Sequence, residues 1–315
     1  MTASFSSGDP VVDRRLEWAR ALLAEGQGRD ACALLHEALQ TCPGWAAGWT
    51  ELGRMAQDSG DIGLARQAFQ SALALDPRDR FGAGVYLDRL RDVPLQQSLP
   101  VAFVETLFDQ FAPSFDQQLT GALGYRGPEA LRDAVLRRGH SRFGQVLDLG
   151  CGTGLMGAAI RPFCDWLGGV DLSSEMLKRA EAKGLYDALE QGDIGRLDLR
   201  PEAFDLIVAS DVFNYLGALD QVLGWCRASL RRGGWLAFTV EKGETALALP
   251  ATNRFTHSAD YVTGLLAQAG FGAVTLTEEV LRQDRGAKVM SLLVTAQAVP
   301  ARRHQSDGEE DCVAA

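Results

Sequence analysis

An apolar run followed by closely spaced glycines constrains this chain more than any other segment. Residues 146–157 read VLDLGCGTGLMG, in which a short hydrophobic stretch meets three alternating glycines, Gly150, Gly152 and Gly154. Glycine adopts positive φ angles without steric cost and lets the backbone approach a ligand closely. The segment therefore predicts a buried strand, a tight turn and the start of a helix, which is the ligand-binding turn of an open α/β sheet.

Strand-length apolar runs alternate with helical patterns around this segment. The candidate strands cover residues 145–149, 166–170, 204–209 and 235–240, and the helical patterns cover 127–138, 174–183 and 217–230. Such alternation predicts a parallel sheet with helices on both faces, with ligands at the carboxyl ends of the strands. Later in the chain, the runs 271–281 and 288–296 are joined by the short turn QDRGA. So short a connection makes two strands antiparallel, and the predicted sheet ends in a hairpin.

A 34-residue repeat precedes this α/β region. Small residues and prolines recur at the same spacing, as Gly26, Ala31, Ala38 and Pro43 and then as Gly60, Ala65, Ala72 and Pro77. In the same register, Trp18 aligns with Leu52 and Leu35 aligns with Phe69. The units resemble tetratricopeptide repeats, which implies two helices in each, and a helix over 81–91 could cap the stack. A plain helical bundle is the alternative. So short an array predicts that these helices pack on the rest of the chain.

The pattern divides the chain into five parts. The predicted division is a disordered N-terminus over 1–10, helical repeats over 11–91, a linker over 92–100, an α/β domain over 101–298 and a disordered tail over 299–315. The linker contains two prolines, and the tail is charged. The α/β domain starts with a phenylalanine-rich helix that Pro113 should end or kink.

Composition argues against several functional classes. The 315 residues carry a net charge of −10, which would repel nucleic-acid phosphates, so we expect no nucleic-acid partner. The sequence lacks the roughly 20 consecutive apolar residues of a membrane span, and its start does not resemble a secretory leader. We therefore expect a cytoplasmic protein without a membrane partner. Six scattered cysteines without C-x-x-C spacing predict neither disulfides nor a metal site.

Two cofactor fingerprints overlap in the glycine-rich segment. Residues 152–157, GTGLMG, match the dinucleotide pattern G-x-G-x-x-G, whereas residues 148–154, DLGCGTG, match the pattern of S-adenosylmethionine (SAM) binders. Asp148 discriminates between them, because a carboxylate there would be repelled by the pyrophosphate of a dinucleotide. SAM carries an ammonium and a sulfonium group instead. The charge of Asp148 therefore favours SAM.

Three further acids, Asp171, Asp193 and Asp211, follow at the ends of successive predicted strands. Each alone could be a helix N-cap, but one acid at each strand end in this order favours a cofactor site. With the glycine loop, they make residues 101–298 resemble class I SAM-dependent methyltransferases, and the whole chain resembles bacterial methyltransferases with N-terminal tetratricopeptide repeats. The resemblance implies a Rossmann-like, mostly parallel seven-stranded sheet with the C-terminal hairpin, SAM as cofactor and S-adenosylhomocysteine as product.

The resemblance also implies which residues form the site. The expected cofactor-binding residues are Asp148, Gly150, Cys151, Gly152, Gly154, Asp171, Leu172, Met176, Gly192, Asp193, Ile194, Asp211, Val212 and Tyr125. The expected acceptor-binding residues are Phe111, Phe115, Arg254 and Asn214. The phenylalanine-rich helix is expected to close over the SAM pocket, although core packing would also explain each phenylalanine.

Methyl transfer from a sulfonium is an in-line displacement, so positioning in a dry pocket supplies most of the catalysis. A general base is needed only for an acceptor that arrives protonated. His257, Tyr215 and Glu241 are the candidates, since each is expected near a strand end or the loop after it. His257 could equally cap the helix that begins near Ser258.

The sequence narrows the acceptor without naming it. Residues 211–214, DVFN, differ from the Asn/Asp-Pro-Pro-aromatic motif of amide and nucleobase N-methylation, and no Pro-Cys nucleophile is present. A peptide or protein side chain and a small molecule remain. In the first case the repeats would recruit the acceptor; in the second they could serve only for homodimerisation. A catalytically silent binding module is the third hypothesis.

Overall fold

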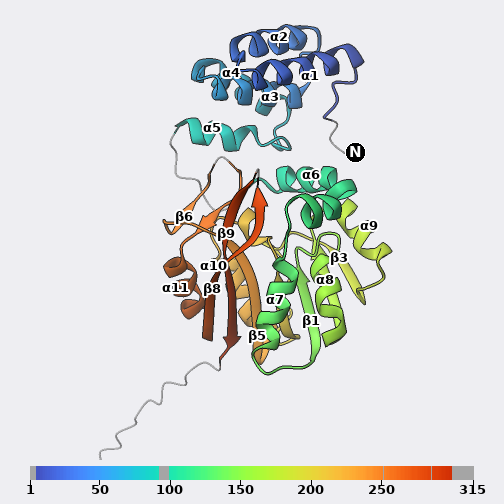
Figure 1. Ribbon diagram of the computed structural model, residues 1–315, viewed down its shortest axis with the longest axis vertical. Helices are drawn as coiled ribbons and strands as arrows, with labels where there is room; N and C mark the ends of the chain where they lie inside the picture. Colours follow the sequence, from blue (N-terminus) through green and yellow to red (C-terminus); the bar gives the residue numbers. More distant parts are fainter. Residues whose placement is uncertain (1–4, 92–98, 251, 285, 300–315) are drawn as a thin grey trace, which may run out of the picture.

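The computed structural model describes residues 5–91, 99–250, 252–284 and 286–299 (Figure 1). Its first part consists of helices, which are α1 (Pro10–Ala24), α2 (Gly28–Thr41), α3 (Ala46–Asp58), α4 (Ile62–Leu75) and α5 (Ala83–Arg91). The turns inside the two helical pairs contain Gly26 and Gly60, with φ angles of 80° and 81° that glycine tolerates. Asp9 and Asp61 cap α1 and α4 by accepting hydrogen bonds from backbone N–H groups. The two-helix units predicted from the repeat are confirmed.

The repeat register explains the core of the helical part, with one exception. Leu35, Leu52 and Phe69 are fully buried, and the Phe69 ring stacks on Tyr86 of α5 at 5.0 Å. Trp18, which the register aligns with Leu52, is instead 59% exposed. It lies on α1, the first of the described helices, so no described helix before α1 covers this side chain. The first helix of the array therefore has an uncovered apolar side chain.

The helical part packs on the α/β part, as its short length predicts. Val85 of α5, Leu99 and Phe255 form one buried cluster. Asn253 donates a hydrogen bond to the Tyr86 hydroxyl at 2.9 Å, and the Arg89 guanidinium donates to the carbonyl of Pro250. Figure 1 shows α5 and α6 (Val101–Phe111) between the first four helices and the sheet.

The α/β part is built on one mixed sheet. Its main strands are β1 (Phe143–Leu149), β2 (Cys164–Asp171), β3 (Ala188–Gln191), β4 (Phe204–Ala209), β5 (Leu230–Lys242), β8 (Phe271–Asp284) and β9 (Ala287–Ala298). They pair in the order β3-β2-β1-β4-β5-β9-β8, and only β9 runs antiparallel to its neighbours β5 and β8. The predicted parallel sheet with a terminal hairpin is confirmed. Two short strands not expected from the sequence, β6 (Leu247–Ala248) and β7 (Thr256–His257), pair at the end of β5.

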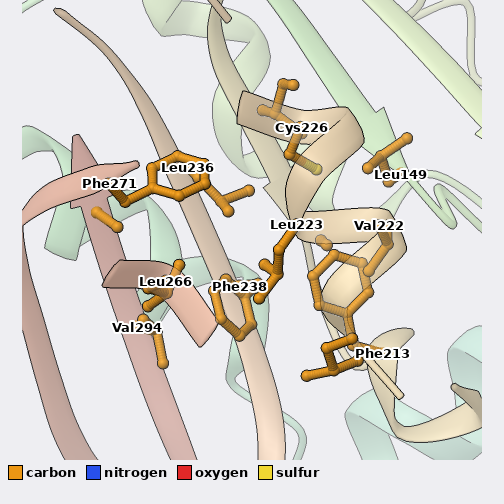
Figure 2. Packing of buried hydrophobic residues seen from close by; sticks show 14 of the residues in the cluster. Leu149, Phe213, Val222, Leu223, Cys226, Leu236, Phe238, Leu266, Phe271 and Val294 are labelled. Carbon is orange, nitrogen blue, oxygen red and sulfur yellow. The ribbon is translucent and has the colours of Figure 1, made fainter. Parts of the chain in front are cut away.

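Helices cover both faces of the sheet. They are α7 (Gly127–Leu136), α8 (Leu155–Ile160), α9 (Ser174–Ala182), α10 (Asp220–Ser229) and α11 (Ala259–Ala269). Figure 2 shows one face, where Leu223 of α10 and Leu266 of α11 pack against Phe238 of β5. On the other face, Leu131 of α7 and Ile160 of α8 belong to a second buried cluster. Strand order reverses between β1 and β4, so a crevice is expected at the carboxyl ends of these two strands.

The segment before α7 changes helical type twice. The helix α6 ends at Phe111, a 3-10 turn η1 (Ala112–Ser114) contains Pro113, and a π-helical turn η2 (Gln117–Ala122) follows. The predicted break at Pro113 is confirmed, because proline cannot donate the helical hydrogen bond.

The predicted unstructured segments are only partly described. Within 1–10, Asp9 caps α1 and the Phe5 ring contacts Phe81 at 5.1 Å, so residues 5–10 are structured, in contrast to the expectation. Residues 1–4, 92–98 of the expected linker and 300–315 of the expected tail lie outside the described residues. Among the described helices, none combines the length and the apolar character that crossing a membrane requires.

Candidate functional site

The glycine loop after β1 has a backbone that only glycine accommodates easily. Gly150, Gly152 and Gly154 have φ angles of 64°, 53° and 91°. A Cβ atom on Gly150 would also lie 2.2 Å from Cγ2 of Val212, which follows β4. The loop and the end of β4 are therefore packed too closely for any side chain at position 150.

Asp171 at the end of β2 holds the glycine loop in place. Its carboxylate accepts hydrogen bonds from the backbone N–H groups of Gly152 and Ser173, both at 2.8 Å. Burial raises the pKa of Asp171, and these two N–H groups oppose the shift by stabilising the ionised form. The acid is thus fixed beside the loop and faces the cavity described below.

Asp148 lies behind the loop and does not line that cavity. It is fully buried, and its Oδ2 accepts a 2.7 Å hydrogen bond from the hydroxyl of Tyr186, while Oδ1 has no hydrogen-bond partner among the described residues. Burial raises the pKa of Asp148 to about 7, although the Tyr186 hydrogen bond lowers it. The Tyr186 hydroxyl also lies where a Cβ of Gly157 would be, at 2.3 Å. The last glycine of the fingerprint makes room for the side chain that holds Asp148.

A cavity of about 1400 Å³ opens beside the glycine loop and extends to the helical repeats. Most residues expected at the site line it, namely Phe111, Phe115, Tyr125, Gly150, Cys151, Gly152, Asp171, Leu172, Gly192, Asp193, Ile194, Asp211, Val212, Tyr215 and Arg254. Its wall does not include Asp148, Gly154, Met176, Asn214, Glu241 and His257. Met176 is buried, and its N–H donates to Ser173.

The α6 to η2 segment is fastened over the cofactor end of the cavity. Asp109 of α6 accepts a 2.6 Å hydrogen bond from the Ser173 hydroxyl after β2. Asp116 accepts from the Thr153 hydroxyl in the glycine loop and pairs with Lys183 at 2.7 Å. Sequence reasoning missed both acids, because a single charged residue on a surface helix carries no local signal of a distant partner.

The other end of the cavity contains a buried ionic network. Arg254 donates from Nη1 to the Tyr215 hydroxyl at 2.5 Å, from Nη2 to Asp211 and from Nε to Glu241. Although burial disfavours the charged guanidinium, Asp211, Tyr215 and Glu241 together raise the pKa of Arg254. Arg282 of β8, which sequence reasoning also missed, donates to the same Glu241 oxygen.

The acids of this network are held by more than the arginine. Asp211 has a φ of 62°, a conformation that non-glycine residues rarely adopt. The Asn214 amide donates to Asp211 Oδ1 at 2.7 Å and accepts from the N–H of Glu241 at 2.7 Å. Asn214 thus braces Asp211 and β5 from outside the cavity.

His257 lies apart from this network. It is fully buried on β7, and its Nε2 is 2.9 Å from the carbonyl oxygen of Gly217. Burial lowers the pKa of His257. The cap of α11 is Ser258, whose hydroxyl accepts from Tyr261 N–H, so His257 does not cap that helix either.

Comparison with known proteins identifies the chemistry. A methyltransferase-domain family model matches residues 147–238, and a tetratricopeptide-repeat model matches 12–55. Human methyltransferase-like protein 27 is 33% identical over 174 residues, which cover 51% of this chain and 68% of the relative. The malonyl-[acyl-carrier protein] O-methyltransferase of Methylococcus capsulatus is 32% identical over 206 residues, which cover 58% and 73%. The chain belongs to the SAM-dependent methyltransferases.

Solved structures agree on the fold. Haemonchus contortus phosphoethanolamine N-methyltransferase 2 superposes with a TM-score of 0.52 at 13% identity, covering 64% of this chain and 60% of that protein. A Haloferax volcanii methyltransferase, solved with the Trm112 activator, gives a TM-score of 0.50 at 18% identity, covering 61% and 98%.

SAM is therefore the cofactor, and the residues present fit it. The loop glycines allow close backbone approach, and carboxylates of Asp171 and Asp193 lie on the cavity wall. Behind the loop, one oxygen of Asp148 has no hydrogen-bond partner among the described residues. A dinucleotide, with its anionic pyrophosphate, would meet the same charges unfavourably.

Proposed function

We propose that this methyltransferase transfers the methyl group of SAM to an acceptor held between the α/β part and the helical repeats. The main support for this proposal is the extent of the cavity, which runs from the glycine loop to Arg20, Glu51 and Arg54 on α1 and α3. Its volume of about 1400 Å³ exceeds the roughly 300–1,000 Å³ of ordinary small-ligand sites, which leaves space for an acceptor beside the cofactor. The repeats then form one wall of the acceptor site.

A group carried on a protein or peptide fits this arrangement best. The acceptor could enter along α3 and α5 and extend toward the glycine loop, where the reaction takes place. The relatives named malonyl-[acyl-carrier protein] O-methyltransferases support the idea, since their names describe an acceptor attached to a protein. A small-molecule acceptor, bound near the repeats, is the second form of the proposal.

In the proposed reaction, the protein acts by positioning and by excluding water. SAM bound at the glycine loop supplies the methyl group. Asp171 would bind its ribose hydroxyls, and residues 192–194 would contact its adenine. Phe115 and Phe108, whose rings lie 6.3 Å apart, would cover the reacting atoms and keep the nucleophile and the methyl group in line.

Exposed side chains on α1 favour a second role for the repeats. Val11 and Trp18 are both exposed apolar residues on this helix. A homodimer formed through α1 would cover them, and it is compatible with the proposed acceptor site. Sedimentation velocity of the wild type and of Trp18→Ser would test it, because loss of a dimer in the variant is expected if α1 is the interface.

Calorimetry tests the cofactor half of the proposal. SAM and S-adenosylhomocysteine should bind and NADH should not, and Asp171→Ala should abolish both binding signals because it removes the carboxylate that holds the loop. Binding of NADH alone would contradict the cofactor site.

A labelling assay tests the acceptor half. Extract of the source cells is incubated with the full-length protein and SAM labelled in its methyl group. Arg54→Gln, on the cavity wall, should reduce incorporation several-fold while SAM affinity stays unchanged. Arg66→Gln on α4 does not alter the cavity wall and is the matched control. Equal incorporation of label by the wild type and both variants would contradict an acceptor role for the repeats.

A further inference from the structure

The chain just before β7 contacts helix α5 on both sides of Arg254. Asn253 donates a 2.9 Å hydrogen bond to the Tyr86 hydroxyl. Phe255 is buried in one cluster with Val85, which precedes Tyr86 on α5. Two successive residues of α5 therefore hold the two residues that flank Arg254.

Both contacts continue to the same carboxylate after β4. Arg254 donates to Asp211 directly. The N–H of Phe255 donates to the carbonyl of Asn214 at 2.7 Å, and the Asn214 amide donates to Asp211 at 2.7 Å. Asp211 and Arg254 line the cavity. Helix α5 is thus connected to the ionic network of the cavity wall by two short series of contacts.

Asn253 and Asp211 both have a backbone conformation that non-glycine residues rarely adopt. Their φ angles are 56° and 62°. Such a conformation is strained and persists where the surrounding contacts enforce it. The contact that holds Asn253 is the hydrogen bond to Tyr86, whereas Asp211 is held by Arg254 and Asn214. Without the bond to Tyr86, the backbone at Asn253 would relax and displace the adjoining Arg254.

Tyr86 also adjoins the part of the wall that the repeats contribute. Its ring lines the cavity and stacks on Phe69 of α4 at 5.0 Å. The guanidinium of Arg54, on the same wall, lies 5.9 Å from the centre of the Tyr86 ring. A cation at this distance over an aromatic ring is attracted to it. An acceptor that contacts Arg54 would therefore act on a side chain that adjoins Tyr86.

We propose that Tyr86 and Asn253 are positioning residues through which the helical repeats hold Arg254 and Asp211 in place for methyl transfer. This inference rests on the proposed function, in which the acceptor lies between the repeats and the α/β part. The repeats then contribute to the rate of transfer as well as to binding of the acceptor. Cofactor binding is independent of this contact, because the glycine loop is held by Asp171.

Initial rates of labelling separate positioning from acceptor binding. A dilution series of source-cell extract is incubated with the full-length protein and methyl-labelled SAM, and the label formed without added protein is subtracted. Tyr86→Phe retains the ring and loses only the hydroxyl, so it should lower the rate at saturating extract about 3- to 10-fold. The extract concentration that gives half of this rate should be unchanged, as should the affinity for S-adenosylhomocysteine in calorimetry. Tyr261→Phe, on α11 and outside the cavity wall, should match the wild type.

A double-substitution cycle tests the hydrogen bond itself. Asn253→Gly removes the amide that donates to Tyr86, and glycine tolerates the φ of 56°. If the two side chains act through their mutual hydrogen bond, the variant with both substitutions should be no slower than the slower single variant. Effects that multiply in the double variant would overturn the proposal, because each side chain would then act independently.

The remaining outcomes distinguish this inference from the proposed function. If Tyr86→Phe is less stable in urea but keeps its rate at saturating extract, the hydrogen bond only joins the two parts of the chain and the positioning role is refuted. A higher half-saturating extract concentration would show that the Tyr86 hydroxyl binds the acceptor itself, which also refutes that role. Both results leave the proposed methyl transfer in place. A wild-type protein that binds S-adenosylhomocysteine yet labels nothing would contradict the proposed function, and this inference would fail with it.

Discussion

Replacing Asp148 by asparagine removes a carboxylate that the fold buries completely. Its pKa is about 7 because burial raises it from an ordinary value of about 3.9. Between these two pH values the folded protein holds a proton that the unfolded chain has already released. The favourable contribution is therefore fully present below pH about 4 and is lost as the pH rises through 7. At about 1.4 kcal/mol per pH unit, the loss amounts to about 4 kcal/mol.

Asparagine has the same shape as aspartate and does not ionise, and its amide oxygen can still accept the hydrogen bond from Tyr186. We therefore expect the stability of Asp148→Asn relative to the wild type to increase by about 3 kcal/mol between pH 5 and pH 8. Urea denaturation of both proteins at the two pH values, without cofactor, measures this difference. The contributions of groups that titrate equally in both proteins cancel in this difference. A difference that does not change with pH would refute the raised pKa.

Two further measurements test what sets the pKa of Asp148 and how its charge affects SAM binding. Tyr186→Phe removes the hydrogen bond that lowers the pKa of Asp148. The pKa of Asp148 should therefore rise further in this variant, and its loss of stability should extend to higher pH than in the wild type. The gain in stability should also come with a loss of function. SAM affinity should fall in Asp148→Asn, because the cationic cofactor is favoured by the ionised carboxylate. Unchanged SAM affinity at pH 8 would show that Asp148 affects only the structure of the glycine loop and does not favour binding of the cationic cofactor.

Three other substitutions have defined outcomes. Gly150→Ala should reduce SAM affinity more than tenfold, because Gly150 has a φ of 64° and an added Cβ would lie 2.2 Å from Val212. Calorimetry should show that SAM affinity partly recovers in the double variant that also carries Val212→Ala. Asp116→Asn removes the ion pair with Lys183, which is partly exposed, so thermal stability should change by less than about 1 kcal/mol while stopped-flow shows faster SAM release. Burial raises the pKa of Asp79 to about 6, so Asp79→Asn should gain up to about 3 kcal/mol over the wild type in urea denaturation as the pH rises from 4 to 6 and no more above it.

The cofactor side of the site was largely accessible from the sequence because its determinants are local. Tight turns require positive φ angles, and the three alternating glycines satisfy them in consecutive positions. Parallel strands bring their carboxyl ends to one edge, so Asp171 and Asp211 could be placed there from strand order alone. The position of Asp148 behind the loop was not foreseen. It depends on Tyr186, a residue that lies 38 positions away in the sequence.

The fold was predicted best where periodicity is strong. The helical repeats and the sheet order follow from patterns that extend over many residues. The strands β6 and β7, which pair with each other, were missed because each has two residues, too few for an alternation of apolar and polar side chains. The exposure of Trp18 was missed for a different reason. Repeat alignment assumes equal neighbours, and the first helix of an array has a neighbour on one side only.

The acceptor side was less accessible because it depends on an irregularity in strand pairing. In the terminal hairpin, Val280 pairs with Met290 and Arg282 pairs with Val289, so Leu281 is an extra residue in β8. Such a bulge changes the direction in which the following side chains point. Here Leu281 is buried, whereas Arg282 reaches the cavity wall and pairs with Glu241 of β5. Strict alternation along residues 271–281 cannot reveal this, since a one-residue shift exchanges the two faces of the strand. The second guanidinium of the cavity wall thus follows a bulge, and a variant that lacks Leu281 should lose acceptor methylation while it still binds SAM.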